Sequence, residues 1–455
     1  MEQLGSAKED LTRIARASLA AIDPRRMISR SLRLEQETLL VQTPDARRAF
    51  DLSRFQRILV LGFGKAAGSM AQGVEEVLGP RIDSGLIVVK PGREKPLRFI
   101  RQIPGGHPVP DEASERAAAQ IAALADSADE RTLVLVLISG GGSSLIAAPS
   151  DQGRNRLTLA DLQETTRQLL ACGAEISELN CIRKHLFLLA GGRLARRAAP
   201  APLVGLVMSD VVGDDLQTIA SGPACSDETT FDRALSIIDQ YGLTKSLPAN
   251  VVRELSDGAA GLIAETPKPA SAELSRATNI LVATNLMALR AAENEAKQLG
   301  YHPLILTSHL AGEAREVARF LAAVAKDVAT SGFPCARPAC ILAGGETTVT
   351  VRGKGKGGRN QELALAFLRE MQKEPRKLGN AWLLSFSTDG EDGPTDAAGG
   401  FASARMAEAA RRAGLRLDKA LHDNDSHTVL EKLEGLFVTG ETDTNVADIQ
   451  IIAVT

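Results

Sequence analysis

Short, wholly apolar runs that alternate with helix-like stretches constrain the fold of this chain more than any other feature. RILVLGFG at 57–64, TLVLVLIS at 132–139 and PLVGLVMSD at 202–210 are such runs, and 111–128 is an intervening stretch with helical spacing. A strand that is apolar along its whole length, rather than at alternate positions, is buried on both faces. Strands of this kind separated by helices are typical of a parallel sheet covered by helices on both sides. The sequence therefore predicts an α/β fold.

The alternation is interrupted once and then resumes, which indicates two domains. The interruption is a polar stretch with two prolines at 264–277, and 455 residues are too many for one ordinary domain. We predict two Rossmann-like α/β domains with largely parallel sheets, at residues 1–268 and 269–455, with an inter-domain cleft as the expected ligand site. An amphipathic helix over 7–22 is expected to pack on the first of these domains.

Composition and charge argue against a nucleic-acid-binding protein, a membrane protein and a disulfide-bonded secreted protein. The chain has 53 Lys and Arg against 56 Asp and Glu, a net charge of −3, which argues against a broad surface for nucleic acid or for an anionic membrane. Its longest apolar run, 133–138, is far shorter than the roughly 20 residues of a membrane span, and its first residues lack the apolar core of a signal peptide. The five cysteines form no CxxC pair, which fits a reducing compartment. We expect a cytoplasmic protein that acts on small molecules, and the oligomeric state stays open, a homodimer included.

A glycine-rich turn follows the first apolar run. Gly62 and Gly64 let the backbone turn tightly and approach a ligand, and the next helix offers free amides to an anion. Lys65 lies at the start of that helix, where a cation is unfavourable for the helix dipole, so we expect it to meet a negative group. The turn lacks the Ser or Thr of a Walker motif and the distal acidic residue of a dinucleotide fingerprint. The alternative is an ordinary strand–helix turn with an incidental surface lysine.

The turn after the second run is the strongest generic signal in the chain. It reads Ser139-Gly140-Gly141-Gly142-Ser143-Ser144. Three consecutive glycines cost chain entropy, and their amides together with three hydroxyls form a suitable cradle for phosphate. The alternative is a close crossing of helix and strand that requires small residues.

Acidic residues follow several of the other strands. Asp210 and Asp214 lie just past the run at 202–210, where carboxylates can hold Mg²⁺ or accept a proton from a hydroxyl. Glu346 and Asp389 occupy similar positions in the second half, and Asp392 follows closely. The alternatives are helix caps for the first pair and a polar loop of Asx turns around Asp389.

Four glycines and four cations are interleaved at 352–359. They predict a flexible, positive loop directed at phosphates or carboxylates, and Arg359, nearest the next helix, is its best-held cation. A solvated basic hairpin is the alternative. The spacing of His422 and His427 is poor for a metal site, and the chain has no GxSxG motif for serine hydrolysis.

These motifs together resemble the class II glycerate kinases, whose C-terminal part, here about 339–448, is named the MOFRL domain. The resemblance extends over nearly the whole chain and rests on motifs that occur in order: GFGKAAGSM, GGHPVPDEAS, LISGGGSSL, LNCIRKHL, SDVVGDDLQTIASGP, AGGETTVTV, GKGGRNQELAL, STDGEDGPTDAAG and TGETDTNVAD. It implies two α/β domains with ATP- and Mg²⁺-dependent phosphorylation of D-glycerate, usually to 2-phosphoglycerate. It also implies that Lys65 and Arg359 act on the transferring phosphoryl group.

The residues themselves suit the same chemistry, because phosphoryl transfer needs cations, amide cradles and a metal held by carboxylates. In this hypothesis the turns at 62–64 and 139–144 bind the nucleotide with Glu346 and Asp389, and Asp210 or Asp214 holds Mg²⁺ or orients the hydroxyl. An NAD(P)H-dependent hydroxypyruvate reductase is the main alternative, because glycine-rich turns also bind NAD(P). A non-catalytic sensor of sugar acids is a third class.

Overall fold

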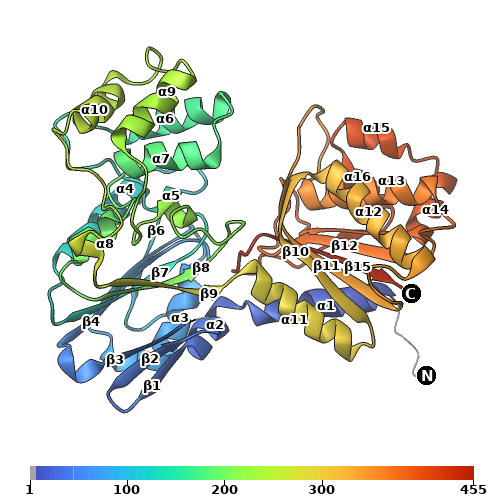
Figure 1. Ribbon diagram of the computed structural model, residues 1–455, viewed down its shortest axis with the longest axis horizontal. Coiled ribbons are helices and arrows are strands. Elements are labelled where there is room, and N and C mark those ends of the chain that lie inside the picture. Colours follow the sequence, from blue (N-terminus) through green and yellow to red (C-terminus); the bar gives the residue numbers. More distant parts are fainter. Residues whose placement is uncertain (1–6, 45) are drawn as a thin grey trace. The chain divides into compact units, whose positions relative to one another are not determined.

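The computed structural model describes residues 7–44 and 46–455, and it divides into two compact units. The first unit comprises Pro24–Ser209 and Asp214–Val282, and the second comprises the residues up to Asp23, Asp210–Gly213 and Ala283–Thr455. Figure 1 shows each unit as a sheet with its own helices. None of the helices in the described ranges combines the length and the apolar character that a membrane crossing requires. The five cysteines are free thiols.

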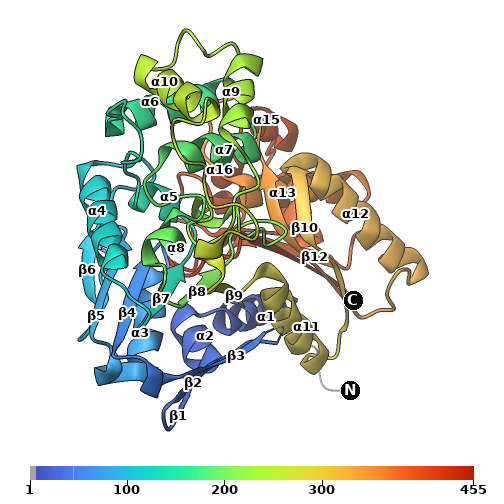
Figure 2. The same ribbon diagram turned by 60° about the vertical axis from the view of Figure 1, so that its left-hand side comes forward.

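A six-stranded sheet forms the centre of the first unit, as Figure 2 shows. Its order is β6 (Arg101–Pro104), β5 (Ser84–Val89), β4 (Arg57–Phe63), β7 (Thr132–Ile138), β8 (Leu203–Met208) and β9 (Ala277–Ala283). The neighbouring strands from β6 to β8 are parallel, and β7 is buried along its whole length. The parallel sheet predicted for this half is confirmed.

Helices and a small hairpin sheet complete the first unit. The helices that accompany the sheet are α2 (Pro24–Ser31), α3 (Ala67–Leu78), α4 (Glu112–Asp126), α5 (Gly142–Leu145) and α8 (Arg193–Ala198). A separate antiparallel sheet consists of β1 (Leu32–Glu35), β2 (Thr38–Gln42) and β3 (Arg47–Asp51). Four more helices share a core of their own: α6 (Leu159–Ala171), α7 (Ile176–Leu186), α9 (Phe231–Gln240) and α10 (Ala249–Ala259). Phe231, Leu162 and Ile182 are buried in that helical core.

The stretch 264–277, which we predicted as a linker, instead packs within the first unit. Thr266 is 1% exposed, and its hydroxyl donates to the carboxylate of Asp227 at 2.9 Å. The carbonyl of Arg276 accepts from the amide of Leu203 at 3.0 Å, so the end of the stretch already lies beside β8. Prolines and polar residues therefore marked a packed, irregular segment here, because its polar groups find partners inside the unit.

The sheet of the second unit differs from the predicted one. Its order is β10 (His302–Glu313), β11 (Ala339–Thr348), β15 (Asp448–Val454), β12 (Ala381–Ser387), β13 (Gly399–Ser403) and β14 (Leu436–Phe437). Only β10 and β11 are parallel to each other, and the other neighbours are antiparallel. The prediction of largely parallel sheets is thus wrong for this unit. The chain's last strand enters between β11 and β12, and a wholly apolar sequence shows that a strand is buried without showing its direction.

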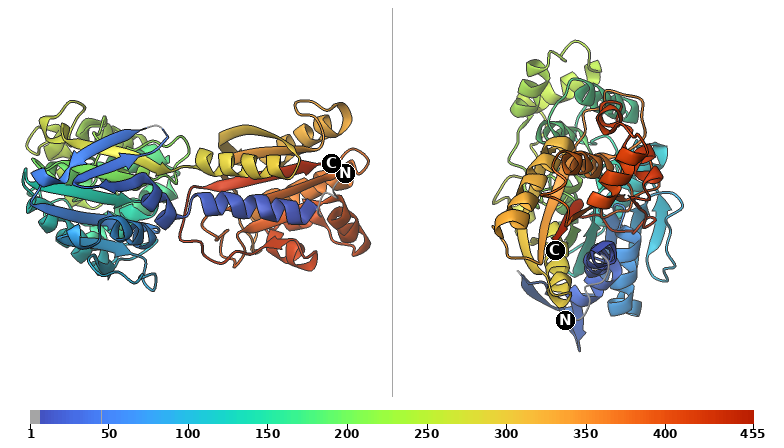
Figure 3. Two further views of the ribbon diagram at one scale, coloured as in Figure 1. Left: turned by 90° about the horizontal axis from the view of Figure 1, so that it is seen from below. Right: turned by 90° about the vertical axis from the view of Figure 1, so that its right-hand side faces the viewer.

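Helices cover both faces of this sheet (Figure 1). On one side lie α12 (Ala314–Ser331) and α13 (Arg359–Lys373), with α14 (Ala404–Arg412), α15 (Leu417–His422) and α16 (Ser426–Lys432) packed around α13. On the other side lie α1 (Ala7–Ala21) and α11 (Asn285–Gln298), which run side by side (Figure 3).

The position of α1 corrects the prediction that the segment 7–22 packs on the first domain. Its apolar face is buried as expected, but its partner is α11 of the second unit. Asp10 is buried there and accepts a hydrogen bond from the Tyr301 hydroxyl at 2.8 Å, and Arg13 pairs with Glu295 at 2.5 Å. Helical periodicity shows that one face is buried, but it does not identify the surface that buries it.

Candidate active site

Two of the glycine-rich turns meet at the carboxyl ends of adjacent parallel strands in the first unit. The turn Gly64-Lys65-Ala66 follows β4, and the turn from Ser139 to Ser144 follows β7. The Lys65 amide donates to the Gly140 carbonyl at 2.9 Å, and the Ala66 amide donates to the Ser139 hydroxyl at 3.0 Å. A β-carbon at Gly64, whose φ is +121°, would lie 2.2 Å from that hydroxyl. Glycine at this position is therefore required by the close contact of the two turns.

The turn from Ser139 to Ser144 presents three backbone amides to which the described residues offer no acceptor. Within residues 7–44 and 46–455, the amides of Gly140, Gly141 and Ser143 donate to no protein acceptor. Gly141 has a φ of +79° and precedes the short helix α5, and a β-carbon there would meet the ring of His107 at 2.8 Å. The Lys65 side chain passes beside the same glycine, since that β-carbon would lie 3.5 Å from the lysine's Cγ. The arrangement has the form of an anion cradle with a lysine at its edge.

Hydroxyl and amide side chains fix the far end of this turn. The Ser143 and Ser221 hydroxyls are 2.9 Å apart, and Ser221 donates to the Asn180 side chain at 3.1 Å. Both Ser221 and Asn180 are buried. Sequence reasoning did not single out Asn180 or Ser221 as part of this site, although both lie in quoted motifs.

The two aspartates predicted to hold a metal lie on the segment that follows β8. Asp210 belongs to the second unit and Asp214 to the first. Asp214 has a φ of +57°, in the left-handed region that Asp tolerates better than most residues. The neighbouring Asp215 accepts from the Gln217 amide at 3.1 Å and from the Thr218 hydroxyl at 2.7 Å, so it forms an Asx turn.

Magnesium suits the chemistry of these donors, although the protein alone does not complete a site for it. The described residues contain no group of three or more His, Cys, Asp or Glu that could hold a metal ion. Mg²⁺ commonly takes only one or two carboxylates from the protein and its other ligands from substrate phosphates and water. The partly exposed carboxylates of Asp210 and Asp214 are donors of this type.

In the second unit, Arg359 is fixed by two carboxylates at the start of α13. Its Nε and Nη2 donate to the Asp448 carboxylate at 2.6 and 2.8 Å, and its Nη1 lies 2.8 Å from Glu346. Asp448 is completely buried, whereas the Glu346 side chain is 45% exposed. Burial opposes the charge of Arg359, but Asp448 and Glu346 outweigh it and raise the pKa of the guanidinium above its ordinary value. The arginine is thus charged and pre-oriented.

Asp392 caps the same end of α13. Its carboxylate accepts from the Asn360 amide at 3.0 Å and from the Gln361 amide and side chain at 2.9 and 3.0 Å. Burial nevertheless raises its pKa to about 6, with Asp448 adding to the rise. Asp389, by contrast, accepts from the Ser387 hydroxyl at 2.7 Å and from the Glu391 amide at 3.0 Å, which is the pattern of an Asx turn.

The glycine-rich loop before α13 is not the flexible loop that its sequence predicted. The Gly355 amide donates to the Asp423 carbonyl at 2.8 Å, and the Asn424 side chain accepts from the amides of Arg352 and Gly353. A β-carbon at Gly353 would lie 2.2 Å from the Asp423 carbonyl oxygen. The glycines therefore serve close packing of two backbone segments. With β11 and Asp392, the loop lines a cavity of about 530 Å³ that includes Glu346 and Arg359.

Comparison with known proteins identifies the family. The chain matches a family model described as a domain of unknown function (DUF4147) over residues 10–256 and the MOFRL family over residues 339–448. A glycerate 2-kinase of Pyrococcus horikoshii is 37% identical to it over 97% of this chain and 96% of its own length. This chain belongs to the glycerate 2-kinase family. The resemblance seen in its sequence motifs is confirmed.

Other members of the glycerate 2-kinase family agree in fold and differ in name. The crystal structure of a glycerate kinase from Thermotoga maritima matches with a TM-score of 0.85 at 36% identity, covering 99% of this chain and 100% of that one. A protein of Agrobacterium vitis, provisionally named hydroxypyruvate reductase, is 39% identical over 99% of this chain and 95% of its own length. Both activities that the sequence suggested therefore occur among the names of the relatives.

Proposed function

We propose that this protein is a glycerate 2-kinase, which transfers the γ-phosphoryl group of ATP to the 2-hydroxyl of D-glycerate and yields 2-phosphoglycerate and ADP. The observation that carries the proposal is the anion cradle of the first unit, with Lys65 beside three amides that donate to no acceptor among the residues the structure describes. Phosphoryl transfer consists largely of positioning and charge neutralisation, so a rigid set of donors at a strand end is the main catalytic requirement.

In this proposal the turn from Ser139 to Ser144 binds phosphate oxygens, and Gly64 lets the neighbouring turn lie close to it. Gly62 is a residue of β4, where the lack of a side chain lets this strand lie close to β5 and β7. Lys65 neutralises charge that develops on the transferring group. Mg²⁺, when it is bound with ATP, would neutralise the remaining phosphate charge, with Asp210 or Asp214 as its protein donor.

The acceptor hydroxyl must lose its proton during the transfer. A carboxylate is a suitable acceptor for that proton, and Asp214 is our first choice because its strained backbone at φ +57° is the kind of feature that occurs at functional sites. Asp210 would then act as a metal ligand. This division of roles between the two aspartates is a proposal that separate Asn variants test.

For the second unit, we propose that Arg359 binds the glycerate carboxylate or the transferring phosphoryl group. It is held by Asp448 and Glu346 with 30% of its side chain still exposed, so it can meet an anion with little loss of side-chain freedom. Glu346 and Asp389 are proposed to contact nucleotide or substrate.

The five free thiols support a cytoplasmic location.

Hydroxypyruvate reduction is the competing activity, and it is favoured by the names of two relatives and by the ability of glycine-rich turns to bind NAD(P). One assay separates the two. Purified protein is given Mg-ATP and D-glycerate, and ADP release is followed through pyruvate kinase and lactate dehydrogenase. A parallel sample receives enolase, which consumes 2-phosphoglycerate but not 3-phosphoglycerate.

ADP release with an enolase signal is the expected result. Release without that signal would assign the 3-hydroxyl as the acceptor. No ADP, together with NADH oxidation by hydroxypyruvate, would refute the kinase and support the reductase.

A further inference from the structure

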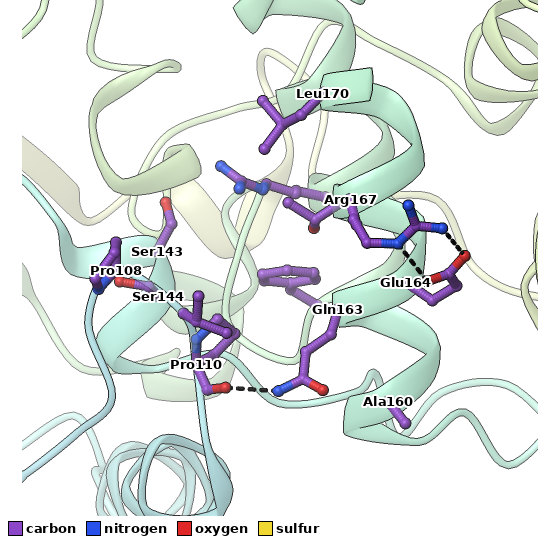
Figure 4. A pocket seen from close by; sticks show the side chains of 13 residues that line it. Pro108, Pro110, Ser143, Ser144, Ala160, Gln163, Glu164, Arg167 and Leu170 are labelled. Atoms are coloured by element: carbon purple, nitrogen blue, oxygen red, sulfur yellow. Dashed lines mark hydrogen bonds and ion pairs between the residues drawn. The ribbon is translucent and has the colours of Figure 1, made fainter. Parts of the chain in front are cut away.

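A cavity of about 800 Å³ opens next to the anion cradle of the first unit (Figure 4). Pro108, Pro110 and the two serines Ser143 and Ser144 border it on one side, and residues of α6 face them from the other. The Gln163 side chain donates to the Pro110 carbonyl at 2.7 Å and so ties α6 to the proline-containing loop. A hydrogen bond thus holds the two walls of the cavity together, and one end of the cavity is formed by Ser143 and Ser144 of the anion cradle.

Two arginines line this cavity, and they differ in how their charge is compensated. Arg167 forms two short contacts with the Glu164 carboxylate, at 2.6 and 2.8 Å, and lies mostly in solvent. Arg183 of α7 is partly buried, and its Nε is fully buried. In the part of the chain that the structure describes, none of its side-chain nitrogens has a hydrogen-bond or ion-pair partner. Burial alone lowers the pKa of Arg183 to about 10.

A guanidinium whose Nε is buried without a hydrogen-bond partner is unfavourable unless a ligand supplies the missing partner and a counter-charge. Arg183 lies in the last turn of α7, where the helix dipole favours a cation, but this weak effect does not replace a hydrogen-bonded anion. The cavity that Arg183 lines also contains Ser143 and Ser144, so a bound anion would meet both the arginine and the cradle.

The rest of the lining is mostly apolar, and part of it is exposed without a ligand. Phe187 is buried at the wall, whereas Val109 and Leu170 are each 65% exposed at the rim. Large apolar side chains that border a cavity mark a place where a ligand with an apolar or aromatic part is buried. Glycerate has three carbons and no such part, so it neither fills this volume nor matches this lining.

We propose that this cavity binds the nucleoside part of the phosphoryl donor, with the base and ribose between α6 and the Pro108–Pro110 loop, and that Arg183 pairs with the donor's phosphates where they enter the cradle. This inference rests on the proposed kinase activity and assigns the nucleotide to the first unit. Arg183 is a binding residue in it, alongside the amides of Gly140, Gly141 and Ser143.

Two variants test the two halves of the proposal separately. Arg183→Met removes the charge and keeps a long apolar side chain. Ala160→Trp fills the cavity from the first turn of α6, where the native side chain is exposed and small. Arg116→Met is the matched control, because Arg116 lies on α4 outside the cavity and pairs with the exposed Glu112. Circular dichroism checks that each variant is folded.

Binding of ATP and of tripolyphosphate, which has no nucleoside, is measured by titration calorimetry without glycerate. We expect Arg183→Met to weaken both probes about 10- to 100-fold, the range for losing a hydrogen bond to a charged group, and Arg183→Lys to restore part of the loss. Ala160→Trp is expected to weaken ATP at least tenfold and tripolyphosphate less than twofold. The control should change neither, and the KM for D-glycerate should stay within twofold in the variants.

Unchanged ATP affinity in Ala160→Trp would overturn the nucleoside assignment, and this test remains valid if Arg183→Met does not fold. A higher KM for glycerate with normal ATP binding in Arg183→Met would overturn it as well. Failure of the proposed function is distinct, because it would appear as wild-type protein that releases no ADP with glycerate.

Discussion

The ion pair that holds Arg359 offers a sharp test of how the second unit fixes its candidate active-site arginine. The guanidinium of Arg359 contacts two carboxylates that differ in solvent exposure. The Asp448 side chain is 0% exposed, and the Glu346 side chain is 45% exposed. Asp448→Asn and Glu346→Gln each remove one negative charge and keep nearly the same shape. The two variants therefore differ chiefly in whether the lost partner was buried.

Removing one partner of a buried ion pair costs about 3–5 kcal/mol, because the other charge is left without compensation. Arg359 keeps Glu346 and 30% exposure, so we take the lower end, about 3 kcal/mol, for Asp448→Asn. For a unit of this size, that loss lowers the midpoint of thermal unfolding by roughly 6–12 °C. An exposed pair contributes less than about 1 kcal/mol, so Glu346→Gln should lower it by at most roughly 4 °C.

Fluorescence of Trp382 is the assay, because the chain has a single tryptophan and it lies on β12 of the second unit, in register with Ala453 of β15. Its signal therefore reports on the sheet that contains Asp448. Circular dichroism follows the whole chain in parallel. If Asp448→Asn destabilises the second unit no more than Glu346→Gln does, the argument that Asp448 is the structural anchor of Arg359 is wrong.

Three further predictions concern the other candidate site residues. Lys65→Ala should reduce kcat/KM at least 100-fold, about 3 kcal/mol by the rate–energy relation, and a change within threefold would contradict its role. Gly141→Ala should destabilise the protein by about 1–3 kcal/mol more than Gly92→Ala in urea unfolding. Both glycines have positive φ, but only at Gly141 would the added β-carbon lie against the ring of His107. Equal losses of unfolding free energy in the two variants would show that this contact is unimportant. Since the folded pKa of Asp392 is raised to about 6 from an ordinary value of 3.8, its protonated form favours folding. The unfolding free energy of wild type relative to Asp392→Asn should therefore fall by up to about 3 kcal/mol between pH 4 and pH 7, and a difference independent of pH would refute the shift.

The strand-end turns of the first unit were predictable because their geometry is local. A wholly apolar run followed by glycines predicts a buried parallel strand and a tight turn, and the carboxyl ends of adjacent parallel strands meet at one edge. Lys65 and the turn from Ser139 to Ser144 were identified on these grounds, and they come together in the structure. The roles assigned to them stay predictions.

Other features depend on contacts between distant parts of the chain. The glycines at 353–357 looked like part of a flexible loop, but they pack against the segment 423–426, more than sixty residues away in the sequence. Asp448, the buried partner of Arg359, is 89 residues distant from it. No local pattern distinguishes a glycine needed for close packing from one that allows mobility.

The sequence by itself determined the elements and the chemistry available at their ends: buried strands, helices with one apolar face, and turns rich in glycine, lysine and carboxylates. Only the tertiary structure decided that α1 packs on α11 and that the last strand enters the second sheet antiparallel to its neighbours. It also decided that Arg167 has a carboxylate partner whereas Arg183 has none among the described residues. The physical reason is that periodicity and composition record whether a residue is buried, whereas direction, partner and charge compensation depend on which distant segment supplies the neighbouring atoms.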